Sequence, residues 1–397
     1  MSTTGVAILG CTGSIGQSTL DVLQRHPERF HVAALLAHRN VERLVEQAKA
    51  TRAPLVGIAD ETLAPQLQQR LRDEGLTCHV LAGSDAAETI ARLPEAQCVM
   101  AAIVGAVGLR STLAAAETGK RLLVANKEAL VMAGWLVLAA ARRSGARIIP
   151  IDSEHNAIFQ CLPPDARLGE APPGVRRLLL TASGGPFRDW SPEALQNATP
   201  EQACAHPVWR MGRKISVDSA TLMNKGLELI EAHLLFGVPV DRIEVLIHRQ
   251  SAVHSLVEYQ DGSMLAQLGS PDMRTPIAHA LGWPQRLPAG VQFLDLAQLG
   301  RLDFERPDVG RFACLGHAIE AARAGGDAPV VLNAANEVAV EAFLEGSLNF
   351  GGIAGVIGEV MSSSTGRHGV NSLESVREAD AAARAAALRL VRGGLGT

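Results

Sequence analysis

The segment from Val6 to Gly16 limits the possible folds more than any other part of the chain. Four apolar residues at positions 6–9 are followed by glycines at positions 10, 13 and 16, and a helical stretch continues to Arg25. A glycine turn between a strand and a helix lets the backbone approach a pyrophosphate and directs helix N–H groups at it. We therefore interpret this segment as a dinucleotide-binding loop. The alternative is that the three glycines only turn the chain.

Short apolar segments alternate with longer helical segments as far as residue 150. Strands that alternate with helices of ten or more residues form right-handed βαβ units around a parallel sheet. The sequence thus predicts an α/β protein in which residues 1–150 form a doubly wound, Rossmann-like cofactor-binding domain. After the first strand, the expected strands cover residues 31–36, 55–58, 98–103, 122–124 and 148–151.

The rest of the chain has a different pattern. Strand-like segments with an Asp261-Gly262 hairpin signal predict a central α+β domain that carries antiparallel strands. Ala-rich segments without a strand pattern then predict a C-terminal helical domain. The expected limits are 151–285 for the central domain, about 184–213 for a lid within it, 286–311 for a linker and 312–397 for the helical domain. The expected strands are 178–181, 243–247, 255–259 and 264–268.

Composition excludes several classes of protein. The 397 residues carry 37 Lys and Arg against 41 Asp and Glu, a net charge of −4, which lacks the basic excess of nucleic-acid-binding proteins. No apolar run reaches about 18 residues, the length that a membrane helix needs. The six cysteines are widely spaced, without a zinc or disulfide pattern. We expect no nucleic-acid partner, no membrane span, no signal peptide and a cytoplasmic location.

The end of the second strand indicates which dinucleotide binds. NAD-binding domains place a carboxylate about 20 residues after the glycine loop, where it contacts the ribose. Here that region reads Ala37-His38-Arg39-Asn40 and has no carboxylate. Because Arg39 can meet a ribose 2′-phosphate, the sequence favours NADP. The alternative is an arginine on a solvated loop.

An acidic cluster follows the strand that ends at residue 151. Asp152 and Glu154 flank Ser153, and oxygen ligands of this kind suit a hard divalent cation. At the carboxyl end of a parallel strand they lie where such sheets bind ligands. The same residue types are also common helix caps, and spacing alone leaves the two interpretations equal.

A second polar run, from Met211 to Glu228, could bind a phosphate. Lys225 would supply a point charge, and Ser and Asn side chains would supply hydrogen-bond donors. Asn224 and Glu228 are four residues apart and share a helix face, so Glu228 could complete the metal site. The alternative is a solvated helix carboxylate.

Several blocks of sequence, taken in their order along the chain, resemble 1-deoxy-D-xylulose 5-phosphate reductoisomerases of the non-mevalonate isoprenoid pathway. The resemblance covers essentially the whole chain. It rests on residues 10–16, Ala125-Asn126-Lys127-Glu128, residues 152–157, Ser183-Gly184-Gly185-Pro186-Phe187, residues 212–228, 267–269 and 271–276, and Leu332-Asn333-Ala334-Ala335-Asn336-Glu337.

The resemblance implies a homodimer that converts 1-deoxy-D-xylulose 5-phosphate to 2-C-methyl-D-erythritol 4-phosphate with NADPH and Mg²⁺ or Mn²⁺. It also implies that the central domain is catalytic and carries the dimerisation sheet. Family members often have Gly at the position of His38, so the resemblance does not give the exact contacts to the adenosine phosphate. By motif, the metal would be held by Asp152, Glu154 and Glu228. The substrate would be bound by Ser153, Glu154, Lys127, Ser183, His206, Trp209, Ser219, Asn224, Lys225 and Glu228. The lid would contain His206, Trp209 and Met211, and the catalytic residues would be His206, Lys127 and Glu154. NADPH would be contacted by Thr12, Gly13, Ser14, Ile15, Arg39, Asn40, Asn126, Glu128, Met211 and Gly212.

Three other functions compete with this one. A generic NADP-dependent dehydrogenase explains the first 150 residues but has no use for the carboxylates. A metal-dependent sugar-phosphate isomerase explains the middle domain but gives the glycine loop no function. A catalytically inactive NADP sensor has no use for Lys225 and Glu228. Both a retro-aldol/aldol sequence and a concerted shift fit the residues of the reductoisomerase.

Overall fold

The computed structural model describes residues 3–209, 211–364, 366 and 369–394. Residues 1–2 and 395–397, at the ends of the predicted domains, and residue 210 in the predicted lid lie outside the described residues. The chain divides into two compact units. Unit 1 comprises Met1–Ala129, Val137–Asn156 and Asp272–Gln292; unit 2 comprises Leu130–Leu136, Ala157–Pro271 and Phe293–Thr397. The domain limits given above stay predictions.

Unit 1 is built on a seven-stranded sheet in the order β4-β3-β2-β1-β5-β6-β7, and every neighbouring pair is parallel. The order reverses between β1 and β5, the arrangement of a doubly wound sheet. This confirms the predicted fold class. The strands are β1 (Thr4–Leu9), β2 (Phe30–Ala37), β3 (Leu55–Ile58), β4 (His79–Ala82), β5 (Cys98–Ala101), β6 (Arg121–Val124) and β7 (Arg147–Pro150).

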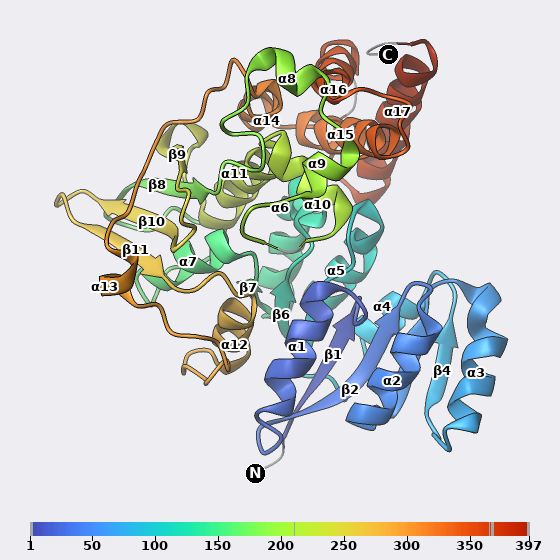
Figure 1. Cartoon of the computed structure of the whole chain (residues 1–397). Helices are drawn as coiled ribbons and strands as arrows, with labels where there is room; N and C mark the ends of the chain where they lie inside the picture. Colours follow the sequence, from blue (N-terminus) through green and yellow to red (C-terminus); the bar gives the residue numbers. More distant parts are fainter. Residues whose placement is uncertain (1–2, 210, 365, 367–368, 395–397) are drawn as a thin grey trace. The chain divides into compact units, whose positions relative to one another are not determined.

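Helices connect these strands and cover the sheet, with α1 and α2 on one face and α4 and α5 on the other (Figure 1). Right-handed crossovers require this change of face, because the strand order runs in opposite directions from β1. The helices are α1 (Ser14–Gln24), α2 (Val41–Thr51), α3 (Ala64–Asp73), α4 (Ala86–Ala91), α5 (Leu109–Ala116), α6 (Lys127–Ser144), α7 (Ser153–Cys161) and α12 (Arg274–Gly282), of which α6 and α7 also contribute residues to unit 2.

Unit 2 holds a four-stranded mixed sheet in the order β11-β10-β8-β9. Strand β10 is antiparallel to β8 and β11, as the hairpin signal predicts, and β8 is parallel to β9. Leu179, Val253 and Leu256 form a buried cluster on this sheet, packed against Leu246 and Leu268. The strands are β8 (Val175–Ala182), β9 (Ile243–Ile247), β10 (Val253–Tyr259) and β11 (Met264–Leu268).

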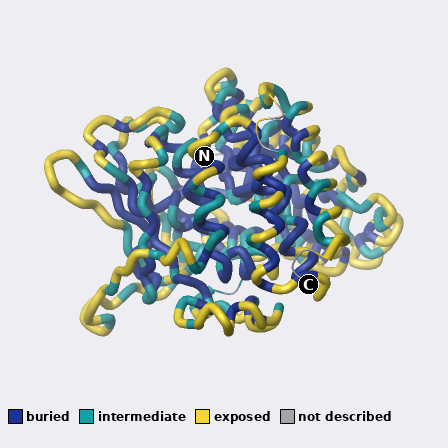
Figure 2. The backbone as a smooth tube through the Cα atoms, turned by 90° about the horizontal axis from the view of Figure 1, so that it is seen from above, coloured by how far each residue is buried: buried dark blue, intermediate teal, exposed yellow. Residues whose placement is uncertain are grey.

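The other elements of unit 2 are helices, and the described part of the chain after residue 312 is mostly helical, as predicted. Buried backbone runs along the strands and inner helix faces, while exposed residues gather in the loops (Figure 2). Among the described residues, no helix combines the length and apolarity needed to cross a membrane. The helices are α8 (Pro192–Gln196), α9 (Pro200–Cys204), α10 (Arg213–Ala220), α11 (Met223–Phe236), α13 (Leu296–Leu299), α14 (Ala313–Ala324), α15 (Ala328–Leu344), α16 (Phe350–Ser364) and α17 (Leu373–Arg392).

Two details differ from the sequence prediction. Strand β4 was not expected, because its four residues are partly exposed and lack a buried apolar run. Strand β5 ends at Ala101 rather than at residue 103, and the residues that follow form a loop. That loop leaves the sheet beside the glycine loop, since Ala101 pairs with Leu9.

The glycine loop generates a stability prediction. A Cβ atom at Gly16 would lie 2.4 Å from the carbonyl oxygen of Cys11, whereas at Gly13 the nearest atom would be 3.4 Å away. Because backbone cannot yield as a side chain can, Gly16→Ala should lower the free energy of unfolding by about 1–3 kcal/mol. Gly13→Ala, the matched control, should change it by less than about 1 kcal/mol. Urea unfolding measures both; equal losses would contradict the close approach.

Candidate active site

The glycine loop joins β1 to α1 and presents the helix start to solvent. Gly10 has φ +89°, a conformation that favours glycine, and its Cβ would lie 2.5 Å from the carbonyl oxygen of Ala102. Helix α1 begins after Gly13 with no side-chain cap and no acidic residue in its first turn among the described residues. Gly13 and Ser14 are exposed, and Thr12 and Ile15 are half-buried. Such a helix start favours an anion.

The predicted 2′-phosphate residues follow β2. Arg39 is exposed, and its Nε lies 3.0 Å from Oδ2 of Asp60. Hydrogen bonds from Thr62 and the nearby Arg39 hold the pKa of the Asp60 carboxyl below its usual range. The side chain of Asn40 caps α2 by accepting a hydrogen bond from the backbone N–H of Arg43 at 3.1 Å. Asn40 therefore also has a structural role.

Asn126 has a structural role that the sequence did not reveal. Its Oδ1 accepts a hydrogen bond from the N–H of Ala129 at 2.6 Å and so caps α6. Its Nδ2 donates to the carbonyl of Ile103 and, at 3.0 Å, to that of Gly105. Asn126 thereby fixes the loop over residues 103–108, which our sequence analysis did not include among the candidate site segments.

This loop exposes apolar side chains at the carboxyl end of β5. Val104 is 58% exposed and Val107 is 77% exposed, although both belong to an apolar segment. Exposed apolar groups at the switch point of a doubly wound sheet are suited to contact a ligand. A sequence signal was present, since Gly105 and Gly108 come shortly after a buried strand, but the sequence analysis extended that strand to residue 103 and made no prediction for residues 104–108.

The first half of the candidate metal site lies after β7. Asp152 precedes α7, and its Oδ2 lies 2.8 Å from Nζ of Lys127, the buried first residue of α6. Ser153 Oγ donates to Glu154 Oε2 at 2.5 Å. Unit 1 thus places Asp152 and Lys127 in contact, and Ser153 and Glu154 at the start of α7. Glu128, next to Lys127, is buried.

Helix α11 carries two of the predicted phosphate residues, Asn224 and Lys225, and both contact Glu228. Asn224 Nδ2 donates to Glu228 Oε1 at 2.5 Å, and the ammonium of Lys225 pairs with Oε2 of the same carboxylate. The side chains of Lys225 and Glu228 are only 3% and 1% exposed. Helix α11 follows Leu222, whose φ of +58° is rare for a branched residue. This pair is a buried charge centre, not the solvated carboxylate of the alternative interpretation.

Ser183 and His206 form a second polar centre in unit 2. His206 Nδ1 accepts hydrogen bonds from the N–H groups of Val208, at 3.2 Å, and Trp209, at 2.8 Å. The proton of the neutral ring is therefore on Nε2, which lies 2.8 Å from Ser183 Oγ and donates to it. Burial, with the charge of Arg188, lowers the pKa of His206 to about 4, so the ring is neutral at pH 7.

The turn after Ser183 contacts α10 directly. Gly184 and Gly185 have φ values of +84° and +68°, and a Cβ at Gly185 would lie 2.5 Å from the carbonyl oxygen of Ser219. The N–H of Gly185 donates to Ser183 Oγ at 3.1 Å. Two donors therefore occupy the Ser183 oxygen, and its own O–H can donate to a ligand. The structure thus brings Ser183, His206 and Ser219 into one region of unit 2.

The predicted lid contains α8, α9 and the segment that leads to α10. The indole of Trp209 lies 6.2 Å from the His254 ring, centroid to centroid. Met211 is half-buried and Gly212 is exposed. The lid therefore already packs Trp209 near β10.

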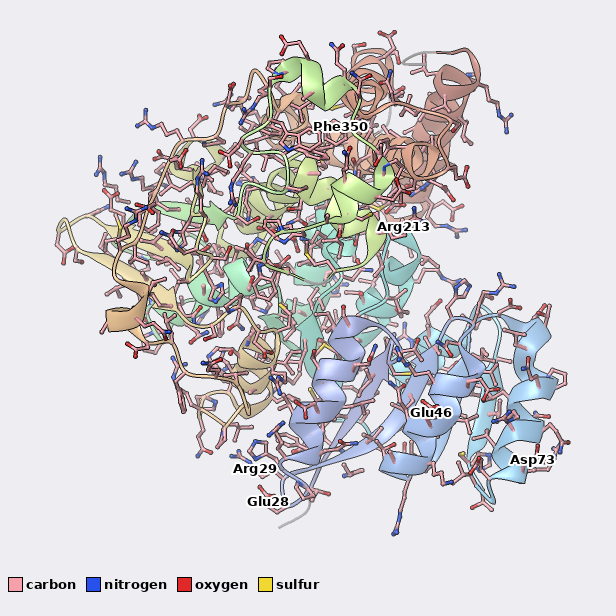
Figure 3. All side chains as sticks on the ribbon, in the orientation of Figure 1. Glu28, Arg29, Glu46, Asp73, Arg213 and Phe350 are labelled. Atoms are coloured by element: carbon pink, nitrogen blue, oxygen red, sulfur yellow. The ribbon has the colours of Figure 1, made fainter. Side chains whose placement is uncertain are left out.

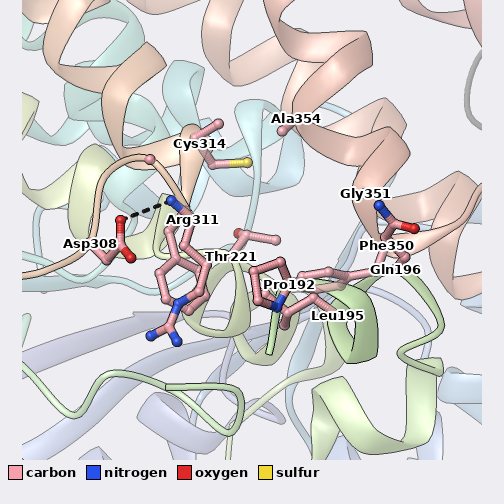
Figure 4. A pocket seen from close by; sticks show the side chains of 13 residues that line it. Pro192, Leu195, Gln196, Thr221, Asp308, Arg311, Cys314, Phe350, Gly351 and Ala354 are labelled. Atoms are coloured by element: carbon pink, nitrogen blue, oxygen red, sulfur yellow. Dashed lines mark hydrogen bonds between the residues drawn. The ribbon is translucent and has the colours of Figure 1, made fainter. Parts of the chain in front are cut away.

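A separate cavity of about 500 Å³ lies in unit 2 and does not include the predicted site residues (Figure 4). It is mostly apolar, and the backbone N–H of Arg311 donates to Asp308 Oδ1 at 3.0 Å on its wall. Its walls are Pro192, Leu195, Gln196, Thr221, Asp308, Gly310, Arg311, Phe312, Ala313, Cys314, Phe350, Gly351 and Ala354.

Three family models match successive parts of the chain. Residues 6–134 match the family described as 1-deoxy-D-xylulose 5-phosphate reductoisomerase, and residues 148–236 match its C-terminal domain. Residues 268–386 match a further DXP reductoisomerase C-terminal domain. Asp152, Glu154, Lys225 and Glu228 fall within the second match.

Relatives of high identity carry the same name. The 1-deoxy-D-xylulose 5-phosphate reductoisomerase of Cupriavidus necator is 58% identical over 383 residues, 96% of each chain. That of Nitrosomonas europaea is 58% identical over 382 residues, covering 96% of this chain and 92% of its own.

Solved structures agree with this result. The Zymomonas mobilis reductoisomerase in complex with NADPH is 47% identical, has a TM-score of 0.90, and the match covers 98% and 99% of the two chains. A reductoisomerase in complex with NADPH, fosmidomycin and magnesium is 46% identical, has a TM-score of 0.94, and the match covers 99% and 100%. This chain therefore belongs to the 1-deoxy-D-xylulose 5-phosphate reductoisomerase family.

Proposed function

We propose that this chain converts 1-deoxy-D-xylulose 5-phosphate to 2-C-methyl-D-erythritol 4-phosphate, a step of the non-mevalonate isoprenoid pathway. The observation that carries this function is 58% identity over 96% of a relative with that name. The chain is an NADP-dependent oxidoreductase, and its cofactors are NADPH and a divalent cation, as in the related structures with NADPH and magnesium. Its substrate is a small phosphorylated molecule, which accords with the fosmidomycin complex.

The NADPH site we propose lies at the carboxyl edge of the parallel sheet. The uncapped start of α1 would receive the pyrophosphate, and Arg39 the 2′-phosphate. Asn126 would act partly through the loop it holds, residues 103–108. The remaining proposed contacts are Thr12, Gly13, Ser14, Ile15, Asn40, Glu128, Met211 and Gly212.

The metal ligands we propose are Asp152, Glu154 and Glu228. Carboxylate oxygens are the ligands that Mg²⁺ and Mn²⁺ prefer. Asp152 and Glu228 each already contact an ammonium group, so both carboxylates lie where a positive charge is stabilised. When bound, the cation polarises the substrate carbonyl as a Lewis acid, and NADPH supplies the hydride.

The phosphate residues we propose are hydrogen-bond donors, which suit an anionic group. Lys225, Asn224, Ser183 and Ser219 would bind the phosphate, and the O–H of Ser183 suits this role. Lys127 and Ser153 would donate to the sugar oxygens, and the Glu154 carboxylate would accept from a sugar hydroxyl. Trp209 and His206 would close over it and exclude water, so that phosphate binding orients the reacting carbons. His206, Lys127 and Glu154 are the proposed catalytic residues.

We also propose a homodimer formed through β11. This strand is at the edge of its sheet, where it has unpaired backbone groups, and Met264 and Leu265 are 48% and 50% exposed. Phe293 and Leu296 in the following segment are 92% and 59% exposed. A second copy of the chain would cover both. A cytoplasmic location is proposed because all six cysteines are free.

The function predicts metal-dependent NADPH oxidation by 1-deoxy-D-xylulose 5-phosphate, followed at 340 nm with Mn²⁺ and after EDTA treatment. EDTA should abolish this oxidation, and product analysis should show the rearranged carbon skeleton. Activity that survives EDTA would favour a simple dehydrogenase.

Glu228→Gln should lower kcat at least about 100-fold, because it weakens the metal site, while NADPH binding stays unchanged. Near-normal turnover of this variant at saturating Mg²⁺ would show that Glu228 is not a metal ligand.

Arg39→Ala should raise the KM for NADPH on the order of tenfold and leave that for NADH nearly unchanged. The reason is the loss of one charge-assisted contact with the 2′-phosphate. Arg43→Ala is the matched control, since Arg43 is an exposed arginine one turn into α2. Equal effects of Arg39→Ala on both cofactors would show that Arg39 does not contact the 2′-phosphate.

Light scattering after gel filtration should give twice the chain mass of 41.9 kDa. Replacing Met264 and Leu265 together by Lys should give monomers, because charge on an edge strand opposes pairing. Leu388→Lys, at a residue 43% exposed on α17, should leave the dimer intact. A wild-type monomer, or a dimer that persists in the double variant, would contradict this interface.

A further inference from the structure

The motif Leu332-Asn333-Ala334-Ala335-Asn336-Glu337 has no part in the site proposed above, yet it contains two buried asparagines. Both lie on α15, and both side chains are fully buried. Asn333 Nδ2 lies 3.4 Å from Met132 Sδ and 3.3 Å from Glu337 Oε1. Asn336 Nδ2 instead donates to Asp218 Oδ1 at 2.8 Å, and Asp218 is on α10. Only the second bond therefore joins α15 to α10.

Asp218 is a fully buried carboxylate in the middle of α10. Its Oδ2 lies 2.9 Å from Nζ of Lys214, one turn earlier, and its Oδ1 accepts the bond from Asn336. A buried charge is costly unless it is paired and hydrogen-bonded, so both partners are needed. The bond between Lys214 and Asp218 lies within α10 and does not fix the rotation of that helix. Asn336 comes from another helix and can fix it.

The rotation of α10 determines where the proposed phosphate donors lie. Ser219 follows Asp218 directly, and the turn that carries Ser183 rests on the Ser219 backbone through Gly185. A helix is about 10–12 Å wide, so a 10° rotation moves its side-chain tips by about 1 Å. A misplacement of about 1 Å can lower the rate on the order of 100-fold. Helix α10 also begins at Arg213, where the lid ends (Figure 3).

We infer that Asn336 is a positioning residue for substrate binding. Through Asp218 it sets the rotation of α10, and through α10 it places Ser219, the Ser183 turn and the end of the lid. This inference rests on the proposed function, because Ser183 and Ser219 are its phosphate donors. The C-terminal helices thereby contribute to the phosphate site without contacting the substrate.

The test compares Asn336→Ala with Asn333→Ala. Both variants remove a buried amide from the same helix, and Asn336→Ala should lose more thermal stability because it takes one partner from the buried Asp218 carboxylate. Asn336→Ala should raise the KM for 1-deoxy-D-xylulose 5-phosphate at least tenfold and raise the inhibition constant of inorganic phosphate by a similar factor. Its KM for NADPH should change less than threefold, because most of the proposed NADPH contacts lie in unit 1. Asn333→Ala should change all three constants less than threefold.

A second test exchanges the residue types at positions 336 and 218, which leaves the side-chain volumes nearly unchanged. Asn336→Asp places a carboxylate against Asp218 and should raise the substrate KM more than Asn336→Ala does. Adding Asp218→Asn to this variant restores a donor–acceptor pair and should lower the substrate KM at least tenfold relative to Asn336→Asp alone. If the wild-type enzyme is active but Asn336→Ala matches Asn333→Ala, or the exchange recovers nothing, this inference is wrong. If the wild-type enzyme does not oxidise NADPH with this substrate, the proposed function itself fails.

Discussion

Pairing of lysine ammonium groups with carboxylates at helix starts is the constraint on which the candidate site depends. Lys127, Lys214 and Lys225 each lie within the first three residues of a helix, where the macrodipole disfavours a cation. Each is paired, respectively with Asp152, Asp218 and Glu228. Pairing removes the cost of an isolated buried charge and keeps ammonium groups where anionic ligands would bind. These three lysines therefore depart from the usual preference for acidic residues at the start of a helix.

Hydrogen-bond direction at His206 determines what that residue can do. Two backbone N–H groups occupy Nδ1, and burial holds the pKa near 4, so the ring at pH 7 is neutral and donates through Nε2. In this arrangement it is a donor to Ser183 and has no free lone pair for a proton. In the unfolded chain this histidine has a pKa of about 6.5, so as the pH falls the unfolded state binds the proton before the folded state does. The neutral His206 ring therefore makes its full contribution to the free energy of unfolding above about pH 6.5, and that contribution is lost as the pH falls toward 4.

Local patterns predicted the parts of the site that depend on consecutive residues. The strand–glycine–helix segment and the Asp152–Glu154 cluster follow from short runs of neighbouring residues, and the parallel strands follow from the alternation of apolar and helical segments. By contrast, Asn126 joins loop 103–108 across more than 20 residues, and Asn336 reaches Asp218 across 118. Hydrophobic periodicity in the sequence does not predict such contacts, because they form only when elements distant in the sequence pack together. Strand β4 was missed for a different reason, since at the sheet edge it needs few buried apolar residues.

The pair of Lys225 and Glu228 links the two ligands of the proposed function. In the proposed function the phosphate would contact Lys225 and the metal ion would contact Glu228, so each ligand would bind one member of this ion pair. Because coupling between two binding sites is reciprocal, any strengthening of metal binding by the phosphate would be matched by an equal strengthening of phosphate binding by the metal. The salt bridge is therefore the place in the proposed site where the two ligands would be coupled.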